Sequence, residues 1–408
     1  MKLIFDDPTF SLQLLRAISE TYYKGADIGE CLSTAYRIKE SDFESWYNEW
    51  LKTAKRVYNY AQECLKNGHK VSARESFLRA SNYYRVAEFF IIDPQDARSV
   101  ETWKSSKECF RQAAQLFSPA FEPIQIPYEK TTLPGYFFKV HDYSTTEDEN
   151  EKQRPILVVH GGFDSTLEEL YFSAAAPALE RGYNCLAFEG PGQGGVIRNQ
   201  KIPFRFDWEK VVTPVIDFLL NNKEEYCVDT QRIALMGISM GGYLAARAVA
   251  FEHRLSACIL YNGVYDGKEA LESSFPSPLL KAIDDGNKMV VNTVIELLME
   301  IDSNIKFNIK HGMWTFGIDS PYELVKDSSK FTLKEIAQNI RCPTLVLDAE
   351  KDDSFPGQPQ KVYDALTCPK KYILFTVEEG AEEHCQCGAP SLSNQRIFDW
   401  VDETLKNL

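Results

Sequence analysis

Short apolar runs rich in Val, Ile and Leu recur along the chain from residue 155 onward, separated by longer segments that include helical patterns. Runs of this length, bounded by turn residues, are typical of strands buried on both faces of a parallel sheet. The expected strands are 155–159, 184–188, 232–236, 257–261, 342–350 and 372–377. Their alternation with helices predicts an α/β fold with a mostly parallel central sheet flanked by helices.

The first part of the chain departs from this pattern because it is helical throughout. Segment 72–90, for example, places apolar and aromatic side chains at helical spacing. Three prolines between residues 119 and 127 then interrupt the helical pattern. We therefore expect a helical N-terminal cap domain at 1–118 and a core domain at 119–408.

Two further segments of the core differ from the strand and helix alternation. Apolar segments at 124–126 and 136–140 predict antiparallel opening strands, joined by a turn at Pro134-Gly135. A helical insertion at about 266–335 follows the strand at 257–261. Because this insertion lies between two core strands on the expected active-site side, it predicts a helical lid.

Composition narrows the class of partner. The chain has 408 residues, a net charge of −14 and a pI of about 5.1, which allows two domains and a full core. This charge would repel nucleic acid and an anionic membrane surface, and no basic stripe offsets it. No apolar run is long enough to span a membrane, and residues 1–8 lack the apolar core of a signal peptide. We therefore expect a small-molecule partner, no nucleic-acid or membrane partner, and a cytoplasmic location.

The segment Gly237-Ile238-Ser239-Met240-Gly241 carries the strongest chemical signal. It follows the apolar run 232–236 and precedes the small-residue helix expected at 242–248. A strand-to-helix turn this sharp leaves room only for glycine on either side of the serine and lifts its hydroxyl clear of the sheet. Ser239 is therefore the candidate nucleophile.

A serine hydroxyl needs a base, and the order Ser, Asp, His places that base late in the chain. The strand at 372–377 leads into His384, which is the only histidine after residue 311. His69, His253 and His311 fall on expected helices or loops, where a solvated surface histidine is the simpler interpretation. His384 is therefore the candidate general base.

The orienting acid is expected just beyond the carboxyl end of a core strand, where the catalytic groups of open α/β sheets lie. Asp352 lies in the turn that follows the strand at 342–350 and is the candidate. The adjacent Asp353 and the more distant Asp266, which follows the strand at 257–261, remain alternatives.

Backbone amides are expected to hold the oxyanion. The segment His160-Gly161-Gly162-Phe163 follows a central strand, and its glycine pair allows backbone N–H groups to approach an oxyanion. In this architecture one donor comes from that loop and the second from the residue after the nucleophile. The candidates are Gly162 or Phe163 for the first donor and Met240 for the second.

No cofactor or metal site is expected. Residues 190–195 satisfy G-x-G-x-x-G, but the dinucleotide motif needs an apolar helix at its third glycine, whereas 196–203 is polar and contains Pro203. We expect instead a turn beside the mouth of the active site. The ten cysteines include no C-x-x-C pair, which predicts reduced thiols rather than a metal site.

Several strings together resemble one α/β-hydrolase group. They are Glu189-Gly190-Pro191-Gly192-Gln193-Gly194, Phe206-Asp207-Trp208-Glu209, Gly237-Ile238-Ser239-Met240-Gly241-Gly242, Leu347-Asp348-Ala349-Glu350 and Glu379-Gly380-Ala381-Glu382-Glu383-His384. The group contains fungal heptaketide hydrolases, bacterial hydrolases that shorten aromatic polyketide chains, and the nicotine-pathway 2,6-dihydroxypseudooxynicotine hydrolase. The resemblance covers nearly the whole chain, and it implies the α/β-hydrolase fold with Ser239, Asp352 and His384 as the triad.

The resemblance also implies a reaction, namely hydrolysis of a carbon–carbon bond next to a ketone without a cofactor. The alternatives are a carboxylesterase or thioesterase acting on a small-molecule ester, and a ligand-binding regulator without turnover. We expect the cap and the lid to roof Ser239 jointly, with Tyr23, Trp314, Phe163 and Asp266 as candidate substrate contacts. The sequence leaves open whether a polyketide substrate is free or carrier-bound, and whether the chain forms a homodimer.

Overall fold

The computed structural model describes residues 1–141 and 153–406 and contains one eight-stranded sheet. The strands are β1 (Glu122–Tyr128), β2 (Thr131–Phe138), β3 (Arg154–His160), β4 (Asn184–Phe188), β5 (Val228–Ile238), β6 (Ala257–Tyr261), β7 (Thr344–Ala349) and β8 (Lys370–Phe375). Their order across the sheet is β1-β2-β4-β3-β5-β6-β7-β8. The pairs β1/β2 and β2/β4 are antiparallel, and all the others are parallel. The predicted mostly parallel α/β sheet is therefore confirmed.

The predicted opening hairpin forms, but its turn lies elsewhere. Pro134 and Gly135 are inside β2, where they pair with Gln125 and Ile124 of β1. A side chain at Gly135 would come within 2.8 Å of the Ala187 carbonyl oxygen of β4. Glycine at position 135 thus allows β4 to approach β2 closely. The chain reverses between Tyr128 and Thr131 instead.

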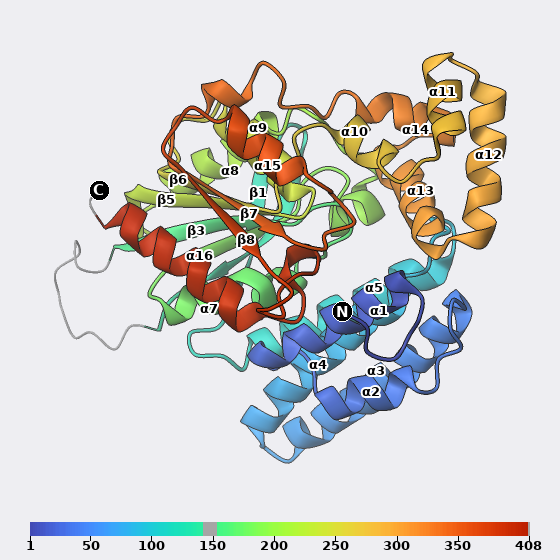
Figure 1. The fold of residues 1–408 in the computed structure, drawn as a ribbon. Helices are drawn as coiled ribbons and strands as arrows, with labels where there is room; N and C mark the ends of the chain where they lie inside the picture. Colours follow the sequence, from blue (N-terminus) through green and yellow to red (C-terminus); the bar gives the residue numbers. More distant parts are fainter. Residues whose placement is uncertain (142–152, 407–408) are drawn as a thin grey trace.

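Alternate residues of the central strands pack on opposite faces, as the pleat of a sheet requires. In β3, Ile156 and Val158 join the apolar cluster formed with helices α8 and α9, whereas Leu157 and Val159 join the cluster of α7, α16 and the N-terminal helices. Figure 1 shows α9 and α16 on opposite sides of the sheet. The helical elements of the core are η2 (Tyr171–Ala175), α7 (Ala176–Glu180), η3 (Val196–Gln200), α8 (Glu209–Asn221), α9 (Gly241–Val249), η4 (Ala337–Asn339), α15 (Gln358–Ala365), η5 (His384–Gln386) and α16 (Pro390–Leu405).

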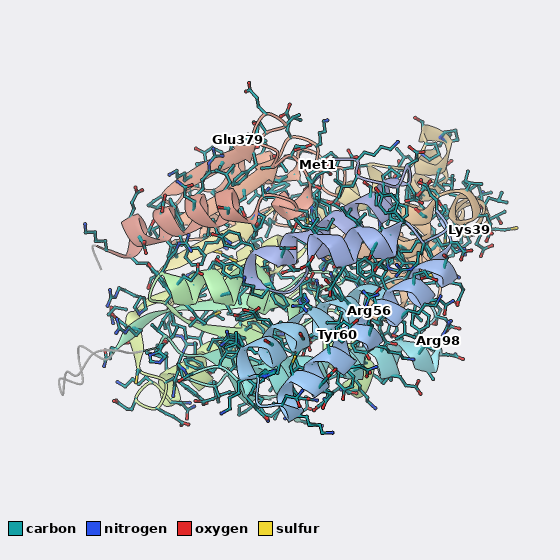
Figure 2. All side chains as sticks on the ribbon, turned by 90° about the horizontal axis from the view of Figure 1, so that it is seen from below. Met1, Lys39, Arg56, Tyr60, Arg98 and Glu379 are labelled. Carbon is teal, nitrogen blue, oxygen red and sulfur yellow. The ribbon has the colours of Figure 1, made fainter. Side chains whose placement is uncertain are left out.

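The chain before β1 is helical, as expected. Its elements are α1 (Pro8–Ser19), η1 (Glu20–Tyr23), α2 (Ile28–Ala35), α3 (Phe43–Lys66), α4 (Lys70–Glu88) and α5 (Ala97–Ala114). The α1 helix begins at Asp7, whose carboxylate accepts hydrogen bonds from the amides of Thr9 and Phe10. Figure 2 shows this helical layer from below, with Arg56, Tyr60 and Arg98 labelled on its surface. The layer packs on the face of the sheet that also carries α7 and α16.

Five α-helices lie between β6 and β7. They are α10 (Gly267–Glu272), α11 (Ser277–Asp284), α12 (Lys288–Ile301), α13 (Ser303–Phe316) and α14 (Pro321–Ser328). Nine of their side chains, together with Phe275 between α10 and α11, form a small apolar core separate from the two cores of the sheet. Figure 1 shows α11 to α13, in gold and orange, at the edge of the molecule and above the blue N-terminal helices. Helix α13 reaches that layer, because the Ser303 hydroxyl donates to the Asp7 carboxylate at 2.9 Å.

Among the described residues, no helix is both long and apolar enough to cross a membrane.

Candidate active site

Ser239 lies at the sharp turn between β5 and α9, as the sequence predicts. Its φ is +63°, a left-handed conformation that costs energy for a residue with a side chain. Added side chains at Gly237 and Gly241 would come within 1.9 Å of the Gly241 carbonyl oxygen and 2.7 Å of the Gly161 carbonyl oxygen, respectively. The turn therefore requires glycine at both flanking positions. The Ser239 amide donates to the Tyr261 carbonyl of β6 at 2.8 Å, which fixes the turn on the sheet.

His384 begins η5, on the loop that follows β8, and its ring contacts Ser239. Its Nε2 lies 2.8 Å from Ser239 Oγ, so the hydroxyl is placed to donate to the imidazole. Its Nδ1 lies 3.0 and 2.9 Å from the two carboxylate oxygens of Asp352. The structure thus brings together three predicted residues from segments far apart in the sequence.

The three candidate acids lie in different environments. Asp352 is 5% exposed and contacts His384. Asp353 is exposed and forms no hydrogen bond or ion pair within the described chain. Asp266 caps α10 through the Glu269 amide and pairs with Lys334 at 2.8 Å. Of these three carboxylates, only that of Asp352 is placed to orient the imidazole.

The charges of this pair oppose the effect of burial. Burial alone would lower the pKa of His384, but the Asp352 carboxylate and the Cys385 thiol outweigh it and raise that pKa well above its ordinary value. Burial alone would raise the pKa of Asp352, but His384 and the Ser354 amide outweigh it and lower that pKa. The Cys385 sulfur lies 3.4 Å from His384 Nε2. The arrangement therefore favours a carboxylate beside an imidazole that readily holds a proton.

The loop after β3 lies against the nucleophile turn. A side chain at Gly162 would come within 2.7 Å of the Met240 nitrogen, so only glycine allows this approach. The backbone N–H groups of Phe163 and Met240 donate to no described residue. Both residues line the cavity over Ser239, whereas Gly162 does not. Phe163 and Met240 are therefore the better-placed pair of oxyanion donors.

Gln193 and Asn262, which the sequence analysis did not single out, support this constellation. Gln193 Nε2 donates to the carbonyls of Gly161 and Gly162 at 2.7 and 3.2 Å, so the 190–195 turn braces the oxyanion loop. Asn262 Nδ2 donates to Asp352 at 2.6 Å. The Gly-rich string was the available signal for Gln193, and no local signal marks Asn262.

His311 also differs from its expected solvated position. It is buried in α13, and its Nε2 lies 3.1 Å from the Phe163 carbonyl oxygen. Burial lowers its pKa, more than the Asp164 carboxylate raises it. A neutral imidazole therefore links the helices between β6 and β7 to the oxyanion loop.

A cavity of about 780 Å³ lies over Ser239. Leu12 and Phe89 of the N-terminal helices line it, as do Phe316 of α13 and Leu324 of α14. Phe89 and Phe307 of α13 stack at 4.4 Å between ring centres, joining the two helical regions. Side chains from both helical regions therefore line the cavity that contains Ser239, as the expected joint roof requires.

Three candidate substrate contacts need correction, because they do not line this cavity. The Tyr23 hydroxyl donates to Glu180 of α7 at 3.0 Å. The Trp314 ring lies 5.1 Å from the Arg198 guanidinium. The Asp266 carboxylate is occupied by the Glu269 amide, which it caps, and by the ion pair with Lys334. The sequence analysis chose these three residues for their aromatic or acidic side chains, and such a choice does not reveal the partners that each side chain finds in the fold. Phe163, the fourth candidate, lines the cavity as expected.

In residues 1–141 and 153–406, no three His, Cys, Asp or Glu side chains cluster so as to hold a metal ion.

Comparison with known proteins shows which family the chain belongs to. The model of the alpha/beta hydrolase family matches residues 156–381. The chain is 34% identical to 20-hydroxy-prefusarin hydrolase FUS2 of Gibberella moniliformis, over 99% of this chain and 98% of the relative. It is 33% identical to alpha/beta hydrolase psoB of Aspergillus fumigatus, over 98% and 94%. The crystal structure of 2,6-dihydroxy-pseudo-oxynicotine hydrolase has the same fold, with a TM-score of 0.73, 21% identity and 95% of both chains covered. The resemblance inferred from the motifs is confirmed, and the chain belongs to the alpha/beta hydrolase family.

Proposed function

We propose that this protein is a serine hydrolase that cleaves a carbon–carbon bond next to a ketone in a polyketide or aryl-ketone substrate. The contact of His384 with both Ser239 Oγ and Asp352 is the observation that carries the proposal. These three groups have the arrangement of nucleophile, base and orienting acid that acyl transfer requires. Family membership independently supports a hydrolase.

In the first step, His384 Nε2 takes the proton of Ser239 and the oxygen attacks a ketone of a β-dicarbonyl chain. The carbonyl π electrons move to the ketone oxygen, which becomes an oxyanion held by the amides of Phe163 and Met240. Asp352 stabilises the imidazolium that forms and keeps Nδ1 protonated. The His384 side chain therefore supplies the base, and the backbone amides supply the oxyanion site.

Collapse of this intermediate breaks the bond to the neighbouring carbon. The electron pair leaves with that carbon as an enolate, which the second carbonyl delocalises, and His384 returns its proton to the carbon. The acyl group stays on Ser239 as an ester. Water, activated by His384, then releases it as a carboxylic acid and restores the serine hydroxyl.

The resemblance to hydrolases of ketone-containing substrates favours cleavage of a carbon–carbon bond over simple ester hydrolysis, and the relatives and the cavity support a long substrate. One relative of nearly full length is named for a prefusarin substrate, and the roofed cavity has room for a long chain. A carboxylesterase or thioesterase remains the alternative, because the same three side chains hydrolyse esters. A ligand-binding regulator has no need of all three.

A direct comparison of substrates tests the proposal. The parent protein should cleave 1-phenylbutane-1,3-dione with a kcat/KM well above that for p-nitrophenyl acetate, and Ser239→Ala should abolish both reactions. Turnover of the ester alone would reject the carbon–carbon reaction and support the esterase alternative.

A further inference from the structure

The side chain of Glu20 is largely buried, and its carboxyl group has no partner in the described chain. Glu20 begins η1, directly after α1, and is 6% exposed. Its side chain forms no hydrogen bond or ion pair with any described residue. Neither carboxyl oxygen is among the fully shielded polar atoms that lack a partner, so the group remains accessible to a ligand.

Glu20 lines the same cavity as Ser239 and His384. The preceding residue ties this part of the chain to the His384 loop, because the Ser19 hydroxyl accepts a hydrogen bond from the Gly388 amide at 2.7 Å. Tyr261 and Cys387, both in the cavity wall, interact electrostatically with Glu20. Glu20 therefore faces the space beside the nucleophile rather than a structural pocket of its own.

The surroundings of Glu20 favour its neutral form. Burial, and then the Glu169 carboxylate, raise its pKa well above the ordinary value, and Arg85 and Arg16 only partly offset this. Arg16 is already committed to other carboxylates, since it binds Glu169 through two hydrogen bonds of 2.6 Å and Asp164 at 3.1 Å. A neutral carboxylic acid differs from a carboxylate in carrying an O–H donor.

Other polar residues lie near Glu20 in the cavity wall. They include Gln13, Arg16 and Ser19 of α1. The part of the wall formed by α13 and α14 carries Phe316 and Leu324, together with the polar Asn304, Asn308 and Ser328. The wall thus has polar side chains near η1 and an apolar patch at Phe316 and Leu324.

We propose that Glu20 is a substrate-positioning residue that donates its O–H to a carbonyl oxygen of the substrate. The substrate is then a chain with a ketone or amide carbonyl at the η1 end and an apolar portion under α13 and α14. This inference rests on the proposed function in one respect, that the cavity over Ser239 is the substrate site. A hydrogen-bond donor aimed at one carbonyl also fixes which neighbouring ketone lies against Ser239.

Ligand binding without turnover tests this role. In a Ser239→Ala background, the dissociation constant of 2-nonanone is measured by isothermal titration calorimetry for Glu20, Glu20→Gln and Glu20→Leu. Leucine removes the donor and should weaken binding about tenfold, whereas glutamine keeps a donor and should bind within about threefold of the parent. Glu101→Leu, the same change at an exposed position of α5, should have no effect.

The pH dependence gives a second readout that needs only the isosteric variant. Raising the pH should weaken binding to the parent as Glu20 ionises, and should leave Glu20→Gln unaffected. Equal affinities of Glu20→Leu and the parent, equal losses in the leucine and glutamine variants, or no ketone binding by the parent would overturn the proposal. Because no turnover is measured, these failures are distinguishable from a failure of the carbon–carbon reaction.

Discussion

Asp352 receives His384 Nδ1 between its two carboxylate oxygens, at 3.0 and 2.9 Å, while one of those oxygens also accepts from Asn262. Asn262 and His384 therefore both fix the position of the Asp352 carboxylate, and that carboxylate orients the imidazole. The neighbouring Asp353 is exposed in the cavity wall and has no such contacts.

We expect Asp352→Asn to reduce kcat by about 10⁴-fold, because an amide at this position favours the wrong imidazole tautomer. Asp353→Asn is the matched change at the adjacent residue and should reduce kcat far less, because Asp353 does not contact His384. Steady-state kinetics of both variants provide the measurement. A larger loss in Asp353→Asn would move the orienting acid by one residue.

Ser239→Ala should leave the fold intact and reduce turnover by several thousandfold, because it removes the attacking oxygen. A fluorophosphonate should label Ser239 in the parent protein, as shown by peptide mass spectrometry. Labelling of another residue, or activity within about tenfold of the parent, would refute the assignment of the nucleophile.

The sequence predicts the core of this site because its signals are local. A G-x-S-x-G turn between an apolar run and a small-residue helix places Ser239, and a single histidine after the last strand places His384. Asn262 and Asp352 are separated by 90 positions, so their contact follows only from the adjacency of β6 and β7. The position of the Glu20 carboxyl group in the cavity wall likewise follows only from the packing of η1 against the His384 loop.

The turn predicted at Pro134-Gly135 from local composition was wrong. Pro134-Gly135 has the composition of a turn, yet both residues lie in β2 because the backbone of β4 passes too close for a side chain. Long-range packing decided that position, which a pattern of neighbouring residues cannot reveal.

The pH dependence of catalysis should follow His384. Only the neutral imidazole can accept the serine proton, and its pKa is raised well above 6.5. The value of kcat/KM should therefore increase with pH, with a midpoint above 6.5. In Asp352→Asn the negative charge is lost while burial remains, so the imidazole pKa should fall. Steady-state kinetics as a function of pH give the first midpoint, and proton NMR of the imidazole gives its pKa in the parent and in the variant. An unchanged imidazole pKa in Asp352→Asn would contradict this account.

Gln193→Leu should lower kcat more than it raises KM. The change removes the hydrogen bonds that fix the Gly161 and Gly162 carbonyls, so the Phe163 amide should lose its alignment toward the oxyanion. Loss of one oxyanion donor costs about 10²-fold in kcat, which is the upper limit we expect here. Gln200→Leu, on η3 and away from the site, is the control. A pure KM effect would show that the turn shapes only the binding cavity.

Phe307→Ala should destabilise the protein by about 3 kcal/mol and raise KM, because it removes a buried ring that stacks on Phe89. Denaturant unfolding and steady-state kinetics test the two effects. Phe251→Ala, at a ring that is 45% exposed, should cost less than about 1 kcal/mol. An unchanged KM in Phe307→Ala would show that the contact between the two helical regions does not shape the substrate site.

The fate of a poly-β-ketone in heavy-oxygen water tests the carbon–carbon reaction most directly. Incubation of the parent protein with 1-phenylhexane-1,3,5-trione in H₂¹⁸O, followed by mass spectrometry, should yield equal amounts of a carboxylic acid and a chain-shortened ketone. The acid should carry the solvent label, and Ser239→Ala should yield neither product. Recovery of the intact triketone from a preparation that hydrolyses p-nitrophenyl acetate would contradict the proposed reaction.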